Sequence, residues 1–162
     1  MTRYQELSKL SVEHSERFYA MRDECMTFAT KLMRQLADYL QCPEEGLAYI
    51  EILPTLRFGD RQASVKQSSP TMIYGKDGFW YFGVQFFFDA PDPTYYGIQN
   101  SLFGLKKRGD LFVLRHEKDT QLYPEDEGAI REFCESIFQD IKAYYETPVS
   151  DPSKRVGFIV PD

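Results

Sequence analysis

Apolar residues recur every three or four positions through the N-terminal part of the chain, which is the spacing of one helix face. Thr2 and Gln5 have the spacing of a capping box, so the helix is expected to begin almost at once, and Pro43 ends it. A helix of this length would extend about 60 Å, longer than a compact domain of this size. We therefore expect it either to break near Ser11 or to lie partly outside its own domain. The apolar stripe comprises Leu7, Leu10, Phe18, Met21, Cys25, Phe28, Leu32, Leu36, Tyr39 and Leu40.

The period then changes to two, which indicates β-strands. A first strand at 47–53 stops at Pro54, and a polar loop at 57–71 has room for a short strand. Two hairpins follow, one around the turn 75–78 and one around Gly109. Their strands are expected at 72–74, 79–88, 98–106 and 111–117.

Pro124 and the acidic residues after it are typical of a helix N-terminus. An apolar stripe from Ile130 to Tyr145 predicts an amphipathic helix that ends before Pro148. The fold class is therefore α+β: a long N-terminal helix, an antiparallel sheet of about four to five strands, and a C-terminal helix, with both helices on one sheet face. We expect residues 1–147 to form a single domain and the tail 148–162 to dock on it.

Aromatic residues, at 15% of the chain, are the unusual part of the composition, with 13 Phe and 11 Tyr. They predict a core or an interface that is built from rings. No apolar run is long enough to cross a membrane, and the N-terminus does not resemble a secretory signal. The three cysteines are odd in number and widely spaced, so a reducing cytoplasmic location is the simplest expectation.

The strand at 79–88 has two unequal faces. One face carries a ring or valine at every position and is expected to face the helices. The other face is too polar for a sealed core and too aromatic for plain solvent. It is either covered by the chain's own tail or first helix, or used by a partner, including a second copy, or used as a ligand platform. The candidate partner-binding residues are Tyr49, Phe79, Tyr81, Gln85, Phe87, Tyr95 and Tyr96.

The net charge of −6 is distributed unevenly, because residues 56–118 carry nine basic and six acidic side chains. The overall acidity disfavours nucleic acid as a partner, although a local basic patch is compatible with it. If the loop 57–66 and the turn 106–108 meet at one end of the sheet, their cations would face a phosphate or an acidic partner. These candidate anion-binding residues are Arg57, Arg61, Lys66, Lys106, Lys107 and Arg108.

Catalytic and metal-binding patterns are weak in this sequence. His14 lies on the apolar helix stripe and is expected to pack there, whereas His116 at a strand end is a candidate general base oriented by Asp119 or Glu51. The histidines and cysteines lack the spacing of metal ligands, no serine lies in a nucleophile elbow, and Cys42 near a helix C-terminus is disfavoured as a thiolate. We therefore expect no metal, no cofactor and no catalytic residue set.

The leading hypothesis is a non-enzymatic protein-interaction module, such as a small inhibitor, adaptor or immunity-type protein, that uses the aromatic sheet face and can self-associate. The alternative is binding of nucleic acid or of a phosphorylated ligand through the basic loops. An enzyme that depends on His116 is the third hypothesis.

Overall fold

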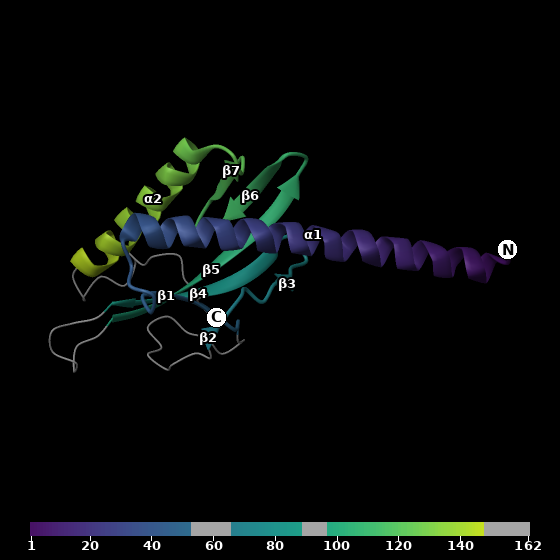
Figure 1. The fold of residues 1–162 in the computed structure, drawn as a ribbon, viewed down its shortest axis with the longest axis horizontal. Coiled ribbons are helices and arrows are strands. Elements are labelled where there is room, and N and C mark those ends of the chain that lie inside the picture. Colours follow the sequence, from purple (N-terminus) through teal and green to yellow (C-terminus); the bar gives the residue numbers. More distant parts are fainter. Residues whose placement is uncertain (53–65, 89–96, 148–162) are drawn as a thin grey trace.

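The long helix α1 dominates the computed structural model, which describes residues 1–52, 66–88 and 97–147 (Figure 1). Helix α1 runs without interruption over Arg3–Leu40. The predicted capping box is present, since the Thr2 side chain accepts from the Gln5 amide and the Gln5 side chain accepts from the Thr2 amide. Gln41 ends the helix in the left-handed region, with φ of 53°. The helix does not break at Ser11; its N-terminal part instead extends beyond the body.

The sheet is antiparallel throughout the described residues and larger than the four to five strands expected. Its main path has the order β2-β1-β4-β5-β6-β7, and β3 also pairs with β4. The additional strand β7 lies in a charged segment, and its four residues are too few to show a recognisable alternation. The strands are β1 Leu47–Ile50, β2 Lys66–Gln67, β3 Ile73–Tyr74, β4 Trp80–Phe88, β5 Gly97–Arg108, β6 Leu111–Arg115 and β7 Asp119–Leu122.

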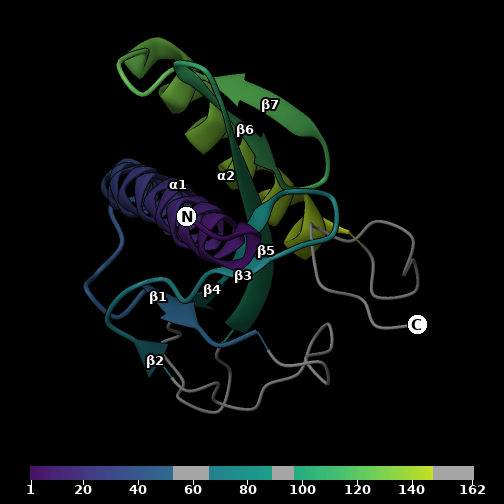
Figure 2. The same cartoon turned by 90° about the vertical axis from the view of Figure 1, so that its right-hand side faces the viewer.

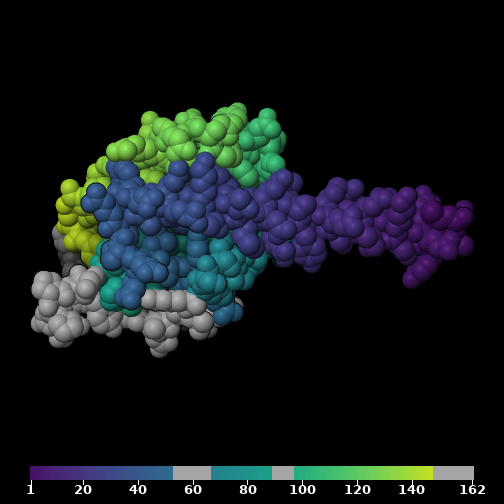
Figure 3. Space-filling model, viewed as in Figure 1, coloured from purple at the N-terminus to yellow at the C-terminus, as the bar shows by residue number. Residues whose placement is uncertain are grey.

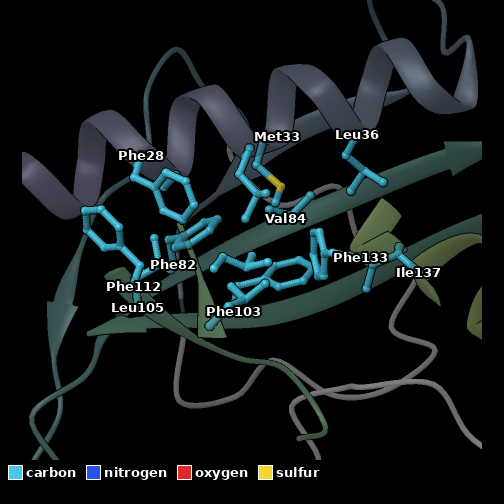
Figure 4. Close-up of a cluster of buried hydrophobic side chains, with 14 of the residues drawn as sticks. Phe28, Met33, Leu36, Phe82, Val84, Phe103, Leu105, Phe112, Phe133 and Ile137 are labelled. Carbon is cyan, nitrogen blue, oxygen red and sulfur yellow. The ribbon is translucent and has the colours of Figure 1, made fainter. Parts of the chain in front are cut away.

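The predicted inner face of β4 packs against the helices, as expected from its alternation. Phe82, Val84 and Phe86 are fully buried, and the Phe82 and Phe103 rings lie 5.6 Å apart across β4 and β5. Figure 4 shows these rings beneath α1, close to the α2 residue Phe133. Helix α1 contributes its Cys25-to-Leu36 stripe to this core.

Helix α2, Glu127–Glu146, covers the same sheet face beside α1 (Figure 2). It begins at Glu127 because the Asp126 side chain caps it by accepting from the Ala129 amide. Polar contacts join the two helices: Gln35 donates to Glu127 at 2.6 Å, and the Tyr39 hydroxyl donates to Glu135. The two helices therefore form one layer that covers one face of the sheet.

None of the described helices is long and apolar enough to span a membrane. The tail 148–162 lies outside the described residues, so its predicted docking stays a prediction.

Candidate interaction surfaces

The outer face of the sheet is more closed than the sequence indicates. The register places Tyr81, Gln85 and Phe87 on this face, paired with Gly104, Asn100 and Ile98 of β5. Gly83 of β4 lies on the same face, and so does Phe79, which directly precedes β4. Phe79 and Gln85 are each only 4% exposed, and the Gln85 amide donates to Asn100 at 3.1 Å. These two side chains therefore offer little surface to a partner, whereas Tyr81 and Phe87 remain half-buried.

Arg115 covers Phe79. Its guanidinium lies 3.8 Å from the centre of the Phe79 ring, donates to Asp77 at 2.8 Å, and forms a bidentate pair with Asp119 at 2.8 and 2.9 Å. The Tyr81 hydroxyl also donates to Asp77, and the Tyr81 ring lies over Gly104, where a Cβ would come within 2.8 Å of it. The hydrogen bond from Tyr81, the Phe79 amide and the Arg115 charge lower the pKa of Asp77. We call Asp77, Phe79, Tyr81, Arg115 and Asp119 the Arg115 cluster; it covers one end of the outer face.

Tyr49 lies on the other face of the sheet, so the prediction that it joins the outer face is wrong. The register pairs Tyr49 with Val84, and directly paired residues share a face. Its ring lies 6.5 Å from that of Phe82 and packs against the core. Its partial burial raises the pKa of the Tyr49 hydroxyl. Tyr95 and Tyr96 lie outside the described residues.

Among the described residues, the first part of α1 has the most exposed apolar side chains. We call residues 3–17 the projecting segment, because α1 extends beyond the body here (Figure 3) and only the last turn of the segment borders the body. Within it Tyr4, Leu7 and Leu10 are 80%, 65% and 49% exposed. Phe18 is the first helical residue that packs on the core. At about 1.5 Å per residue the projecting segment is about 22 Å long.

The stripe on this segment continues the buried stripe of the same helix. Its positions follow one another at alternating steps of three and four, the pattern of a helix that packs against another element. From the N-terminus they are Tyr4, Leu7, Ser11, His14, Phe18, Met21, Cys25, Phe28 and Leu32. Cys25, Phe28 and Leu32 are buried against the sheet. The same side of α1 is therefore covered by the body at one end and uncovered at the other.

Only the 106–108 part of the predicted basic cluster has side chains that the structure describes, so its assembly stays a prediction. Arg57, Arg61 and the side chain of Lys66 lie outside the described part of the chain. Lys107 and Lys106 extend to opposite faces of β5: Lys107 pairs with Glu24 of α1 at 2.6 Å, and Lys106 lies 5.6 Å from the centre of the Phe79 ring. Arg108 is exposed at the hairpin tip.

Lys106 and Lys107 do line a pocket that the sequence did not indicate. It lies where α1 leaves the body, and its volume is about 310 Å³. We call it the α1 exit pocket. Its described lining comprises His14, Arg17, Phe18, Met21, Tyr74, Gly78, Trp80, Lys106 and Lys107. His14 is thus an exposed wall of this pocket rather than the packed residue expected.

His116 has other neighbours than the two carboxylates predicted for it. Asp119 is held by Arg115, and Glu51 follows β1, which is separated from β6 by β4 and β5. The His116 ring stacks on Phe103 at 4.7 Å, with 17° between the ring planes. His116 and Asp140 line a pocket of about 250 Å³. Partial burial raises the pKa of Asp140, and the negative charge of Glu117 raises it further. Stacking on a core ring points to a packing role for this histidine.

The cysteines are poor nucleophiles in this environment. Cys25 and Cys134 are buried, and burial raises the pKa of each thiol to about 11. Burial also raises the pKa of Cys42. Within the described ranges no group of three or more His, Cys, Asp or Glu residues is placed to hold a metal ion.

Comparisons with known proteins return nothing. No protein-family model, no curated protein and no solved structure matches this chain. The surfaces of the molecule itself are therefore the only guide to its function.

Proposed function

We propose that this protein is a non-enzymatic protein-interaction module that pairs with a second copy of itself through the projecting segment of α1. The observation that carries this proposal is the exposed apolar stripe, which includes Tyr4 and Leu7 and continues the stripe buried against the sheet. A helix with one uncovered apolar face gains stability when another helix covers it. An isolated helical segment of about this length is marginal in water.

Charge favours a second copy as the occupant. The projecting segment has three basic residues, Arg3, Lys9 and Arg17, and three acidic residues, Glu6, Glu13 and Glu16, so its net charge is zero in a chain of −6. Two such segments can approach without repulsion, and a strongly charged partner would gain little from them. An antiparallel pair keeps the two acidic bodies at opposite ends, which makes it the favoured arrangement.

The other surfaces are secondary in this proposal. Tyr81 already donates to Asp77, and Phe79 lies beneath Arg115, so the outer sheet face offers less free apolar surface than the helix. The free cysteines suit a reducing compartment such as the cytoplasm.

The test compares two substitutions on the same segment. Leu7→Glu places a charge in the stripe, whereas Val12→Glu changes an aliphatic residue of similar exposure, 57% against 65%, about 140° away around the helix. Sedimentation velocity over about a hundredfold range of concentration should show that the wild type and Val12→Glu dimerise. Leu7→Glu should weaken the dimer by about tenfold or more, because it buries an unpaired charge. Circular dichroism checks that both variants keep the helix.

A wild-type protein that stays monomeric over that range would refute self-pairing, and equal weakening by both substitutions would remove the stripe as the interface. A monomer that instead captures another protein in a Leu7-dependent manner would keep the interaction module but replace its partner.

A further inference from the structure

The α1 exit pocket combines an aromatic wall with basic side chains from separate elements. His14, Arg17 and Phe18 come from α1, whereas Lys106 comes from β5. Its volume of about 310 Å³ lies at the lower end of the range for small-ligand sites, about 300–1,000 Å³. A single ring with one charged group fits this volume, and a dinucleotide does not.

Three rings form the aromatic wall. The Phe18 ring lies 4.9 Å from the rings of both Tyr74 and Trp80, and Tyr74 and Trp80 lie 4.8 Å apart. Trp80 is only 4% exposed and forms the base of the wall, whereas Tyr74 is 50% exposed. A half-exposed ring that is braced by two others is a preorganised surface on which a flat ligand can stack.

The positive charge of the pocket is not fully neutralised by the protein. Lys107 pairs with Glu24, but Arg17 and Lys106 belong to none of the ion pairs among the described residues. Among the described residues, Lys106 donates only to the backbone carbonyl of Asp77, at 3.4 Å. No acidic residue appears in the described lining of the pocket.

The turn beside the pocket leaves room for Lys106. Gly78 adopts a φ of +84°, and a Cβ there would lie 3.1 Å from the Lys106 Nζ atom. The positive φ of the turn therefore favours glycine at this position, and a side chain there would also press on the end of Lys106. The lysine is held at the pocket rim in a chain of net charge −6, where most basic residues would be drawn toward carboxylates.

From these contacts we propose that the α1 exit pocket binds a phosphate monoester that also carries an aromatic ring, with Tyr74 stacking on the ring and Arg17 and Lys106 contacting the phosphate. A nucleoside monophosphate and a phosphotyrosine side chain share this chemistry. Arginine is suited to bidentate contact with phosphate oxygens, and lysine adds a point charge. The site is separate from the stripe at Tyr4 and Leu7 that supports helix pairing.

Trp80 provides a direct readout, because it is the only tryptophan of the chain and lies in the pocket wall. Full-length protein is titrated with adenosine monophosphate, phosphotyrosine, adenosine and inorganic phosphate while Trp80 fluorescence is recorded. We expect a saturable change with adenosine monophosphate or phosphotyrosine that weakens as salt is raised. Adenosine and inorganic phosphate should each bind at least about tenfold more weakly, because each lacks one half of the contact. The compound that binds more tightly identifies a nucleotide or a phosphorylated protein as the source.

Two sets of variants test the assigned contacts. Arg17→Gln with Lys106→Gln should weaken binding by about tenfold or more, whereas Arg3→Gln with Lys142→Gln removes the same charge from distant positions and should leave it nearly unchanged. Tyr74→Leu should weaken binding of the ring compounds and not of inorganic phosphate. At protein concentrations low enough to keep the wild type monomeric, Leu7→Glu, which tests helix pairing, should bind the ligand as the wild type does.

The proposal is overturned if neither ring compound gives a saturable change. It is equally overturned if the control variant Arg3→Gln with Lys142→Gln weakens binding as much as Arg17→Gln with Lys106→Gln does. The effect would then be one of overall charge. Unfolding curves of each variant separate loss of binding from loss of fold.

Discussion

Replacing Arg115 with glutamine should uncover Phe79 and lower stability by an amount that depends on pH. The guanidinium lies 3.8 Å from the Phe79 ring centre and 2.8 Å from the Asp77 carboxylate. A cation over a ring at a partly exposed site contributes about 0.5–1 kcal/mol. A partly exposed ion pair contributes about 0–1 kcal/mol, and the contact with Asp119 lies in solvent and adds little.

We therefore expect Arg115→Gln to lower the free energy of unfolding by about 1 kcal/mol at pH 7. In a chain of this size that corresponds to a fall in Tm of about 2–4 °C. Thermal unfolding followed by circular dichroism measures the change. Arg115→Lys keeps the charge but loses the planar stacking, so its Tm should lie between those of the wild type and Arg115→Gln. Arg3→Gln, an exposed charge on the projecting segment, serves as the control.

The sign of the pH dependence follows from the carboxylates. Hydrogen bonds from Tyr81 and Arg115 lower the pKa values of Asp77 and Asp119 respectively. A carboxylate whose pKa is lowered by folding stabilises the protein above its unfolded pKa, about 3.9, and loses that contribution as the pH falls through its folded value. The deficit of Arg115→Gln should therefore shrink in acid to the part due to the Phe79 ring. A deficit that is the same at pH 2 and pH 7, or absent at both, would refute this account of the Arg115 cluster.

Two further predictions concern a half-buried carboxylate and a buried amide. Burial and the neighbouring Glu117 raise the pKa of Asp140, so its charged form destabilises the fold. Asp140→Asn should therefore raise Tm at pH 7. It should give no gain below pH 3, where the wild-type carboxyl is neutral. Gln99 is only 2% exposed, and its amide atoms find no hydrogen-bond partner among the described residues. Gln99→Met, which keeps the shape, should raise the free energy of unfolding by about 1–3 kcal/mol in urea titrations, and a loss of stability would contradict this.

Periodicity was sufficient to predict both helices, most of the strands and the inner face of the sheet. Alternation in 79–88 identifies Phe82, Val84 and Phe86 as core residues, because residues two apart in a strand share a face whatever their partners are. The capping box at Thr2 is equally local and was predicted from its spacing. Strand β7 was missed since its sequence, Asp119–Leu122, is polar on one side and only four residues long.

The contacts that decide the outer face could not be predicted, because they depend on register between strands. Tyr49 changes faces with a shift of one residue, and its pairing with Val84 is visible only in the structure. Arg115 reaches Phe79 from β6 across the intervening strand β5, which no local pattern indicates. The α1 exit pocket likewise joins Arg17 to Lys106, which are far apart in the chain.

The length of α1 relative to the body explains why the pairing surface and the pocket adjoin one another. At about 1.5 Å per residue, its 38 residues span about 57 Å, and the core covers its stripe only from Phe18 onward. The last covered ring and the first uncovered stripe residues must then meet at the edge of the sheet, where the turn 75–78 and β5 supply Gly78 and Lys106. A second copy paired antiparallel along the projecting segment would bring its own N-terminus toward this edge. Ligand in the α1 exit pocket should therefore change the dimer dissociation constant, and the reciprocity of coupled binding requires that dimerisation change ligand affinity by the same factor.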